Sequence, residues 1–332
     1  MGRVSFKYTK TDNASSRSFF HFNNLFHSNY YFAKNTSLKN CFFYLLVFLI
    51  SLGLVAQTDY PKLPLIIDAD TANEIDDLFA LVRALGEPRF QLLGITAAQF
   101  HQSPYASKDT ALESHQLNQE LLALLPQHNV PLVRGSAHPL KNSNTAQPSK
   151  ASDFIIQQAK ALPTDQKLQL VILGSCTNVA SALLQAPEIA PKLQIYYIGF
   201  WHDPAQNTYN KKEFNTGNDP LATNVLLDFK GLDFSVMSAT TCQHLVFDKT
   251  TTFKNLEDNP LGLYLKNRWS TFKRWWTDKD PEQKRWIMWD LAIIEALAHP
   301  EWAERKTFVT PKENLQRNIQ IYISIDPLKM QE

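Results

Sequence analysis

The segment 66–81 constrains the fold of this chain more than any other part of the sequence. Its sequence is IIDADTANEIDDLFAL, so a short apolar run passes through an acid-rich stretch into a second apolar pattern. The run at 64–67 has the composition of a buried parallel strand, and apolar residues then recur at helical spacing from 75 to 82. Five acidic residues crowd the turn between these elements: Asp68, Asp70, Glu74, Asp76 and Asp77. Open α/β sheets place their ligands at such turns.

A cluster of carboxylates at a strand-to-helix turn has two interpretations. Several carboxylates held close together repel one another, and a bound cation removes that repulsion. All-oxygen sites suit hard ions, and flexible ligation by six to eight oxygens favours calcium. Acidic residues are also common in the first turn of a helix, where they cap free amides and face the positive end of the helix dipole. Both interpretations are consistent with this segment taken alone.

The first 56 residues differ in character from the rest. Residues 1–40 carry six basic side chains and one acidic side chain, and residues 41–56 form the apolar stretch CFFYLLVFLISLGLVA. This layout is typical of a secretory signal, and the stretch is shorter than the roughly 20 residues of a transmembrane helix. We therefore expect an exported protein, periplasmic or secreted, with no stable membrane insertion after signal removal. Anchoring through residues 41–56 is the alternative.

Residues 57–332 are long enough for one large α/β domain, and they contain no repeat, linker or low-complexity tract. The whole chain has a net charge of +1, so this part carries about −4 once the basic leader is set aside. A mildly acidic domain argues against a nucleic-acid partner. Its two cysteines, Cys176 and Cys242, have no zinc-type spacing, and they either pair or remain buried thiols. A homo-oligomer is compatible with the sequence.

Apolar or β-branched runs alternate with helical patterns throughout this domain. The expected strands are 64–67, 90–97, 130–134, 168–173, 193–200, 233–238 and 319–325. The expected helices are 76–85, 107–125, 152–161, 179–184, 220–229, 260–276 and 288–298. This alternation predicts a single α/β domain with a mostly parallel central sheet and helices on both faces, like an open Rossmann-type sheet.

Polar residues follow several of these strands, and the carboxyl ends of parallel strands share one edge of a sheet. His101 follows the second strand, GSCTN follows the strand at 168–173, and a polar loop with Glu213 follows the strand at 193–200. Carboxamides and carboxylates in that loop suit a polyhydroxylated ligand, although an Asn-rich turn has the same composition. Trp289 precedes Asp290 late in the chain, and its ring suits either core packing or stacking on a ligand.

Five segments in this order resemble the inosine-uridine-preferring nucleoside hydrolase family over about residues 64–326. They are the acidic turn, a DxDxxxDD signature lengthened by two residues; VPLVRGSAHPL at 130–140; LVILGSCTNVASAL at 170–183; the triplet Glu213-Phe214-Asn215; and the pair Trp289-Asp290. The resemblance implies the nucleoside hydrolase fold.

The resemblance also implies roles for individual residues. Those expected to hold a calcium ion are Asp70, Asp77, Asp290 and the backbone carbonyl of Leu173. Those expected to bind substrate are Asp76, Asn207, Glu213, Asn215, Trp289 and His101, with Asn210 as an alternative to Asn207. The implied reaction is hydrolysis of the N-glycosidic bond of a ribonucleoside, in which calcium lowers the pKa of a water molecule and Asp70 acts as general base. The transition state is expected to be oxocarbenium-like.

Two departures from the family pattern concern the substrate. Residues 71–75 lengthen the acidic turn, and Trp289 stands where base-unspecific members carry a histidine. An aromatic residue there resembles the purine-preferring branch, because stacking on an indole favours a purine. The alternatives are a related hydrolase that acts on another ribose-like glycoside or nucleotide derivative, and a non-catalytic protein that binds a nucleoside or sugar.

Overall fold

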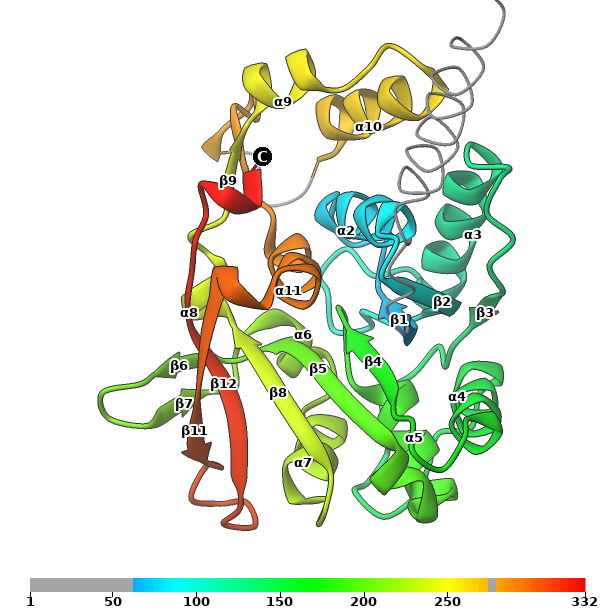
Figure 1. Ribbon diagram of the computed structural model, residues 1–332, viewed down its shortest axis with the longest axis vertical. Helices are drawn as coiled ribbons and strands as arrows, with labels where there is room; N and C mark the ends of the chain where they lie inside the picture. The colour runs from blue at the N-terminus through cyan, green and yellow to red at the C-terminus, as the bar shows by residue number, and fades with distance from the viewer. Residues whose placement is uncertain (1–61, 274–278, 332) are drawn as a thin grey trace, which may run out of the picture. The chain divides into compact units, whose positions relative to one another are not determined.

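Eight strands form the central sheet of the computed structural model, which describes residues 62–273 and 279–331 (Figure 1). The strands are β1 (Leu63–Ala69), β2 (Phe90–Ala97), β3 (Leu132–Arg134), β4 (Leu168–Ile172), β5 (Leu193–Gly199), β8 (Asp233–Ser238), β11 (Ala303–Val309) and β12 (Asn318–Ile325). Their spatial order is β11-β12-β8-β5-β4-β1-β2-β3. Neighbouring strands are parallel except for β11 and β12, which are antiparallel. The predicted mostly parallel sheet is therefore confirmed.

The central strands are buried on both faces, which explains their nearly continuous apolar sequences. Leu65 and Ile67 of β1 belong to the core on one face, whereas Ile66 belongs to the core on the other. All three side chains are fully buried. Because successive side chains of a strand point to opposite faces, a run of three apolar residues serves both cores at once.

Helices cover both faces of the sheet (Figure 1). One face carries α2 (Asp76–Gly86), α3 (Thr110–Ala123), α10 (Pro260–Thr271) and α11 (Trp289–Ala298). The other carries α4 (Lys150–Ala161), α5 (Thr177–Gln185) and α7 (Pro220–Asp228). Shorter helices are α6 (Phe214–Asn218), α8 (Ala239–Cys242), α9 (Lys249–Asn255), η1 (Pro187–Lys192), η3 (Pro300–Trp302) and η4 (Lys329–Gln331). The helices predicted on both faces are thus confirmed.

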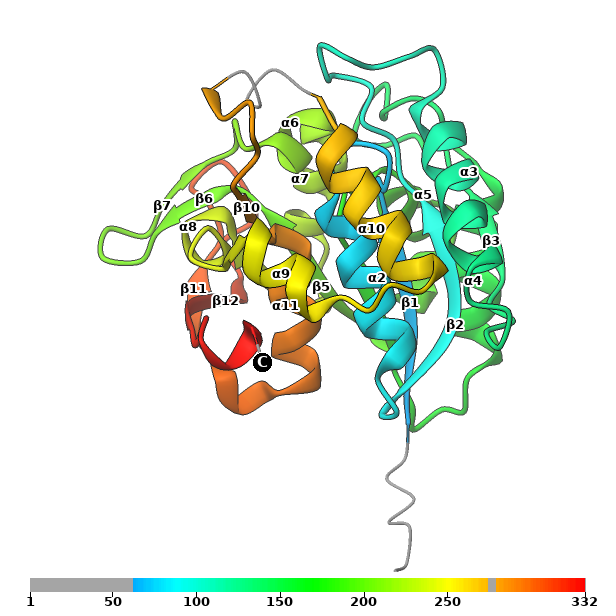
Figure 2. The same ribbon diagram turned by 90° about the horizontal axis from the view of Figure 1, so that it is seen from above.

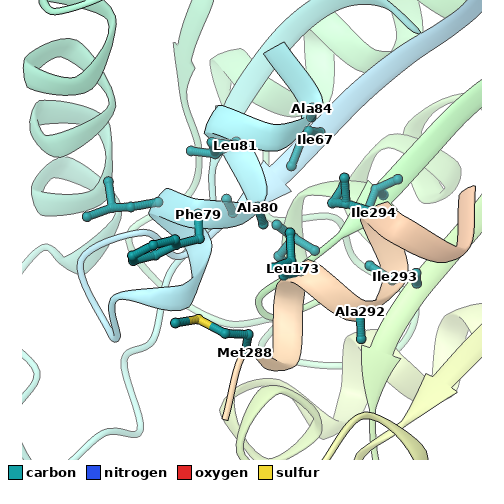
Figure 3. Close-up of a cluster of buried hydrophobic side chains, with 14 of the residues drawn as sticks. Ile67, Phe79, Ala80, Leu81, Ala84, Leu173, Met288, Ala292, Ile293 and Ile294 are labelled. Atoms are coloured by element: carbon teal, nitrogen blue, oxygen red, sulfur yellow. The ribbon is translucent and has the colours of Figure 1, made fainter. Parts of the chain in front are cut away.

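Helices α2 and α11 pack against each other beside the ends of β1 and β4. Figure 3 shows Ala80 and Leu81 of α2 in one buried cluster with Leu173, which follows β4, and with Ala292 and Ile293 of α11. Burying an aliphatic side chain of this size stabilises a fold by about 1.5–3 kcal/mol. The contact brings together two helices that both begin with acidic residues.

A second layer covers α2 and α11. Seen from above, α9 and α10 lie over both helices (Figure 2). The fully buried ring of Trp269 in α10 lies edge to face with Phe79 of α2, with 6.0 Å between the ring centroids. Trp286 contacts the same indole at 5.8 Å. These aromatic contacts fix α10 on the outer side of α2.

The structure differs from the sequence prediction around residues 201–218. The predicted polar loop instead contains a two-stranded hairpin, β6 (Trp201–Asp203) and β7 (Thr208–Asn210), followed by α6. Strands of three residues are too short to show a periodic pattern, and β9 (Val246–Asp248) and β10 (Arg285–Ile287) were missed for the same reason. The antiparallel edge strand β11 was missed because most of its side chains are exposed and its pattern is charged.

Several other predictions have a definite outcome. Cys176 and Cys242 are both free and buried, in the cores on opposite faces of the sheet, so the interpretation as buried thiols is correct. The helix predicted at 260–276 ends at Thr271, and residues 274–276 lie outside the described residues. No helix in the described part of the chain is long and apolar enough to cross a membrane. The leader at 1–56 also lies outside the described residues, so export stays a prediction.

Candidate active site

The order in which strands are added to the sheet changes side at β1, and this topological switch point creates a crevice. β2 and β3 extend the sheet on one side of β1, whereas β4, β5 and β8 extend it on the other. Ligands of open α/β sheets bind at such a switch point, outside the carboxyl ends of the strands. A cavity of about 240 Å³ lies there. Its lining includes eight residues predicted from the sequence: Asp70, Asp76, Asp77, Leu173, Glu213, Asn215, Trp289 and Asp290.

Asp70 lies directly after β1 and faces the turn that follows β4. A side chain at Gly174 would bring a Cβ atom within 2.9 Å of the Asp70 side chain, so the glycine allows the two turns to approach. Asp70 is 2% exposed, and its Oδ2 atom is buried with no hydrogen-bond partner among the described residues. A buried carboxylate oxygen without a partner is costly, which makes it a candidate for a functional role.

Three further carboxylates meet where α2 and α11 begin. Oxygen atoms of Asp76, Asp77 and Asp290 all lie within 4.8 Å of one another. The backbone amide of Asp290 donates to Oδ2 of Asp76 at 3.1 Å, so part of the cluster does cap a helix. Oδ1 of Asp77 is buried and has no partner among the described residues. Capping therefore accounts for only some of these oxygens.

Burial and mutual repulsion both act on this cluster. Burial raises the pKa of Asp70 well above its usual range, and the carboxylates of Asp77 and Asp76 raise it further. Burial raises the pKa of Asp77 and of Asp290 in the same way, with neighbouring carboxylates adding to the effect. The pKa of Asp76 rises to about 6 because burial outweighs its hydrogen bonds to backbone amides. A nearby positive charge would reverse these shifts.

The cluster fits a hard divalent cation. It offers carboxylate oxygens in a buried position, and Oδ1 of Asp77 and the nearby Oδ2 of Asp70 make no hydrogen bond within the part of the chain that the structure describes. Asp76, Asp77 and Asp290 form the closest group, while Asp70 and Leu173 line the same cavity. The carbonyl oxygen of Leu173 accepts a hydrogen bond from Nδ2 of Asn215 at 2.7 Å, which fixes its position. The sequence predicted Asp70, Asp77 and Asp290 as the metal-binding carboxylates. The three carboxylates that lie closest together include Asp76 in place of Asp70.

Glu213 and Asn215 also line the cavity, at the start of α6. The carboxylate of Glu213 accepts hydrogen bonds from the amides of Asn215 and Thr216, which cap this short helix. It also accepts one from the amide of Phe200 at 3.0 Å. Phe200 has a φ of 27°, a strained value for a residue with a side chain, and this bond helps to hold it. Glu213 thus fixes the turn that leads into Trp201.

Trp201 is a lining residue that the sequence analysis missed. Its ring lies edge to face with Trp289, with 6.2 Å between centroids, and both indoles line the cavity. Its position two residues after the end of β5 was the available signal, because residues that follow parallel strands lie at the ligand-binding edge of the sheet. Glu74 and Lys212 also line the cavity. Glu74 comes from the lengthened turn, so the two extra residues add a carboxylate to the site.

Two predicted substrate-binding residues are not part of the described lining. Asn207 lies in the β6–β7 turn, where its side chain contacts His202 at 3.1 Å and donates to the carbonyl of Val309 at 3.1 Å. His101 lies beside His138, with ring centroids 5.1 Å apart. Both residues belong to neighbouring surface segments rather than to the cavity wall.

A buried polar network holds the end of β1 that leads into the cavity. Asp68 of β1 accepts hydrogen bonds from Thr96 at 2.6 Å and from Nδ2 of Asn178 at 2.9 Å. Asn178 also donates to the carbonyl of Ala97. Burial raises the pKa of Asp68 to about 7 despite these two side-chain hydrogen bonds. The network ties the end of β1 to β2 and α5, and so it fixes the turn that carries Asp70.

Comparison with known proteins places this architecture among nucleoside hydrolases. The chain matches the inosine-uridine preferring nucleoside hydrolase family over residues 65–326. It is 24% identical over 183 residues to the pyrimidine-specific ribonucleoside hydrolase RihA of Shewanella sp. (strain ANA-3), which covers 49% of this chain and 55% of that protein. RihA of Salmonella paratyphi A (strain ATCC 9150 / SARB42) is 27% identical over 184 residues, with shares of 49% and 56%. The chain spans about half the length of these relatives.

Solved structures share the fold. A plant nucleoside hydrolase, PpNRh1, has a TM-score of 0.64 at 19% identity, covering 81% of this chain and 96% of that one. A purine-preferring ribonucleoside hydrolase from Gardnerella vaginalis has a TM-score of 0.62 at 19% identity, covering 81% and 95%. The matched family segment includes every strand of the central sheet from β2 to β12 and most of β1. The chain therefore belongs to the inosine-uridine preferring nucleoside hydrolase family.

Proposed function

We propose that this protein hydrolyses the N-glycosidic bond of ribonucleosides in a calcium-dependent reaction, with Asp70 as general base. The observation that carries the proposal is the pairing of two kinds of group in one cavity. Carboxylate oxygens with no hydrogen-bond partner among the described residues lie just after β1 and at the start of α2, and the side chains of Glu213 and Asn215 line the same cavity. The first set suits a cation and a water molecule, and the second suits a sugar.

The cation would be held by Asp76, Asp77 and Asp290 together with Asp70 and the carbonyl of Leu173. When bound, it supplies positive charge that makes a nearby water molecule more acidic. Identification of this ion as calcium rests on the all-oxygen donor set and on the resemblance to the family.

The side chains of this chain then carry out the remaining steps. Asp70 accepts a proton from water while the water oxygen forms a bond to the anomeric carbon. The bond to the base nitrogen breaks, and the base leaves with its electron pair and takes up a proton. The surrounding carboxylates stabilise the positive charge that develops on the sugar ring. Glu213 and Asn215 orient the ribose through its hydroxyl groups.

We further infer a preference for purine nucleosides. Trp289 and Trp201 line the cavity and lie edge to face at 6.2 Å. A purine offers a larger face than a pyrimidine for contact with these rings. The named relatives point in both directions, since RihA is called pyrimidine-specific and the Gardnerella vaginalis enzyme purine-preferring. The preference therefore rests on the two indoles of this chain.

The test is release of free ribose by the purified full chain from a panel of purine and pyrimidine nucleosides. We expect release in calcium buffer, loss of release in chelator, and a loss of about 10²–10⁴-fold in Asp70→Ala. Asp165→Ala is the matched control, because Asp165 is exposed and precedes β4, at the opposite end of that strand from the lining residue Leu173. Ribose release that survives both chelator and Asp70→Ala would overturn the mechanism. Nucleoside binding without release would favour the non-catalytic binding protein.

A further inference from the structure

A second cleft opens at the end of β3. Its volume is about 750 Å³, within the usual range for small-molecule sites, and it shares no lining residue with the candidate active site. Its walls are the middle of α3, the turn after β3 and the start of α4. Because β2 separates β3 from β1, the two strand ends lie about 10 Å apart. The cleft is therefore a separate site on the same edge of the sheet.

Basic side chains line this cleft. They are Arg134, Lys150, His115 and His138, and no carboxylate occurs among the described lining residues. Arg134 forms an ion pair with Asp109, which lies outside the lining. Asp109 offsets the charge of Arg134, so Lys150 supplies most of the net positive charge of the described lining. The guanidinium of Arg134 keeps further N–H donors, and together with Lys150 these can attract an anion.

Both flanking walls of the cleft are attached to one buried side chain, Asn178. The backbone amide of Ser136 and the hydroxyl of Ser149 both donate to Oδ1 of Asn178, at 3.0 and 3.2 Å. A Cβ atom at Gly135 would lie 2.2 Å from the carbonyl oxygen of Ala97, so this glycine allows the turn to approach β2. The cleft is held in shape without a ligand, which lowers the entropic cost of binding one.

One imidazole in the cleft lacks a partner. Nδ1 of His115 is buried and makes no hydrogen bond within the described part of the chain. Burial lowers the pKa of His115, and the positive charges of Arg134 and Lys150 lower it further. The imidazole is therefore uncharged at neutral pH, and Arg134 and Lys150 are the cationic side chains of the described lining. Lys150 is also the first residue of α4, at the positive end of the helix dipole.

We propose that this cleft binds the phosphoryl group of a small molecule, either inorganic phosphate or a sugar phosphate. Arginine and lysine side chains commonly bind phosphate in proteins, and so do the N-termini of helices. The cleft is larger than a single phosphate requires, so a sugar phosphate also fits its volume. This site does not depend on hydrolysis at the other cavity, and it is tested without any measurement of activity.

The test is isothermal titration of the full chain with inorganic phosphate and with ribose 5-phosphate, in chelator and at constant ionic strength. The chelator matters because a cation in the acidic cavity would itself attract phosphate. We expect saturable binding that Arg134→Gln/Lys150→Gln weakens at least tenfold. Lys160→Gln, at the other end of α4, is the matched control and should bind like the unaltered chain. Tighter binding of ribose 5-phosphate would identify a sugar phosphate, and equal affinity would identify the phosphate group alone.

Three results would overturn this proposal: no saturable binding of either ligand, unchanged affinity in the double variant, or an equal loss in Lys160→Gln. Lys150→Glu keeps the test decisive if the double variant fails to fold. Lys150 is exposed, and an acidic residue in the first turn of a helix is favourable. This single variant should also lose at least tenfold in affinity, and unchanged affinity would count against the site.

Discussion

Buried carboxylates at the two ends of α2 have pKa values shifted in opposite directions. At its start, Asp76 and Asp77 lie among other carboxylates, and burial raises their pKa values. At its end, Glu87 is 5% exposed and accepts hydrogen bonds from Arg89 at 2.6 Å and from Arg83 at 2.9 Å. Burial opposes ionisation of Glu87, but these hydrogen bonds outweigh it and lower its pKa to about 2.

This contrast separates a binding site from a structural ion pair on a single helix. We call the end of α2 at Glu87 the paired end, because arginines bond to its carboxylate, and the start at Asp76 and Asp77 the unpaired end. Arg83 also donates to Glu295 of α11 at 2.7 Å, so the paired end holds α2 against α11. The unpaired end lies where the same two helices begin, at the candidate active site. We infer that the paired end raises the free energy of unfolding. The unpaired end lowers it in the metal-free chain, and its carboxylates serve to bind a cation. The four predictions that follow test this difference.

Replacing a carboxylate at the unpaired end should stabilise the metal-free chain. In chelator at pH 8, we expect Asp77→Asn to raise the free energy of unfolding by about 3 kcal/mol, the cost of burying its charge among other carboxylates. Denaturant unfolding of the full chain measures this change, with Asp165→Asn as the surface control. A fall in stability would show that the side-chain hydrogen bond between Asp77 and Asp290 outweighs this repulsion.

Replacing the carboxylate at the paired end should have the opposite sign. Glu87→Gln removes charge-assisted hydrogen bonds, and we expect the free energy of unfolding at pH 7 to fall by about 2 kcal/mol. Because folding lowers the pKa of Glu87, its contribution is complete above the ordinary value of 4.5 and is lost as the pH falls to about 2. Equal free energies of unfolding for Glu87→Gln and the unaltered chain at pH 7 would contradict the difference between the two ends of α2. Glu304→Gln, at an exposed position, is the control.

The unpaired end should also give the metal-free chain an unusual pH dependence. The pKa of Asp76 is about 6 in the folded state, against an ordinary value of 3.8. Between pH 4.5 and 6 the folded state therefore binds more protons than the unfolded state. The free energy of unfolding should fall as pH rises, by up to about 1.4 kcal/mol per pH unit for each such carboxyl group. Unfolding at several pH values in chelator measures the slope, which Asp76→Asn should reduce.

Glu74 should have the smallest effect. It lines the cavity from the lengthened turn, its charge raises the pKa of Asp77, and it accepts a hydrogen bond from Nε1 of Trp286 at 3.3 Å. Glu74→Gln keeps an acceptor for Trp286 and removes one negative charge. We expect a gain of less than about 1 kcal/mol in metal-free stability and calcium binding that is a few times weaker. An unchanged calcium affinity would place Glu74 outside the influence of the ion.

The sequence predicted the parts of this molecule that follow from local pattern. Continuous apolar strands such as the one containing Ile66 and Ile67 identified the parallel sheet, because both of its faces are buried. The acidic turn identified the site, because strand ends meet at the switch point. Asp70, Asp77 and Asp290 do line one cavity although they come from distant parts of the chain.

Other features depend on contacts that local pattern does not encode. Trp201 lines the cavity directly after Phe200, whose positive φ is stabilised by a hydrogen bond from its amide to Glu213, 13 residues away. The resemblance to the family assigned Asn207 to the site, but the β6–β7 hairpin directs it toward Val309. The basic cleft at β3 likewise arises from tertiary packing, because its lining comes from α3, from β3 and the turn after it, and from the start of α4.

Calcium binding to the full chain tests the central inference most directly. Isothermal titration of the metal-free protein with calcium should show one saturable site per chain, and Asp290→Asn should weaken it at least a hundredfold. The same titration of Glu87→Gln should give the affinity of the unaltered chain, because Glu87 lies at the paired end of α2. Absence of calcium binding, or an affinity that Asp290→Asn leaves unchanged, would contradict a cation site at the start of α2 and α11.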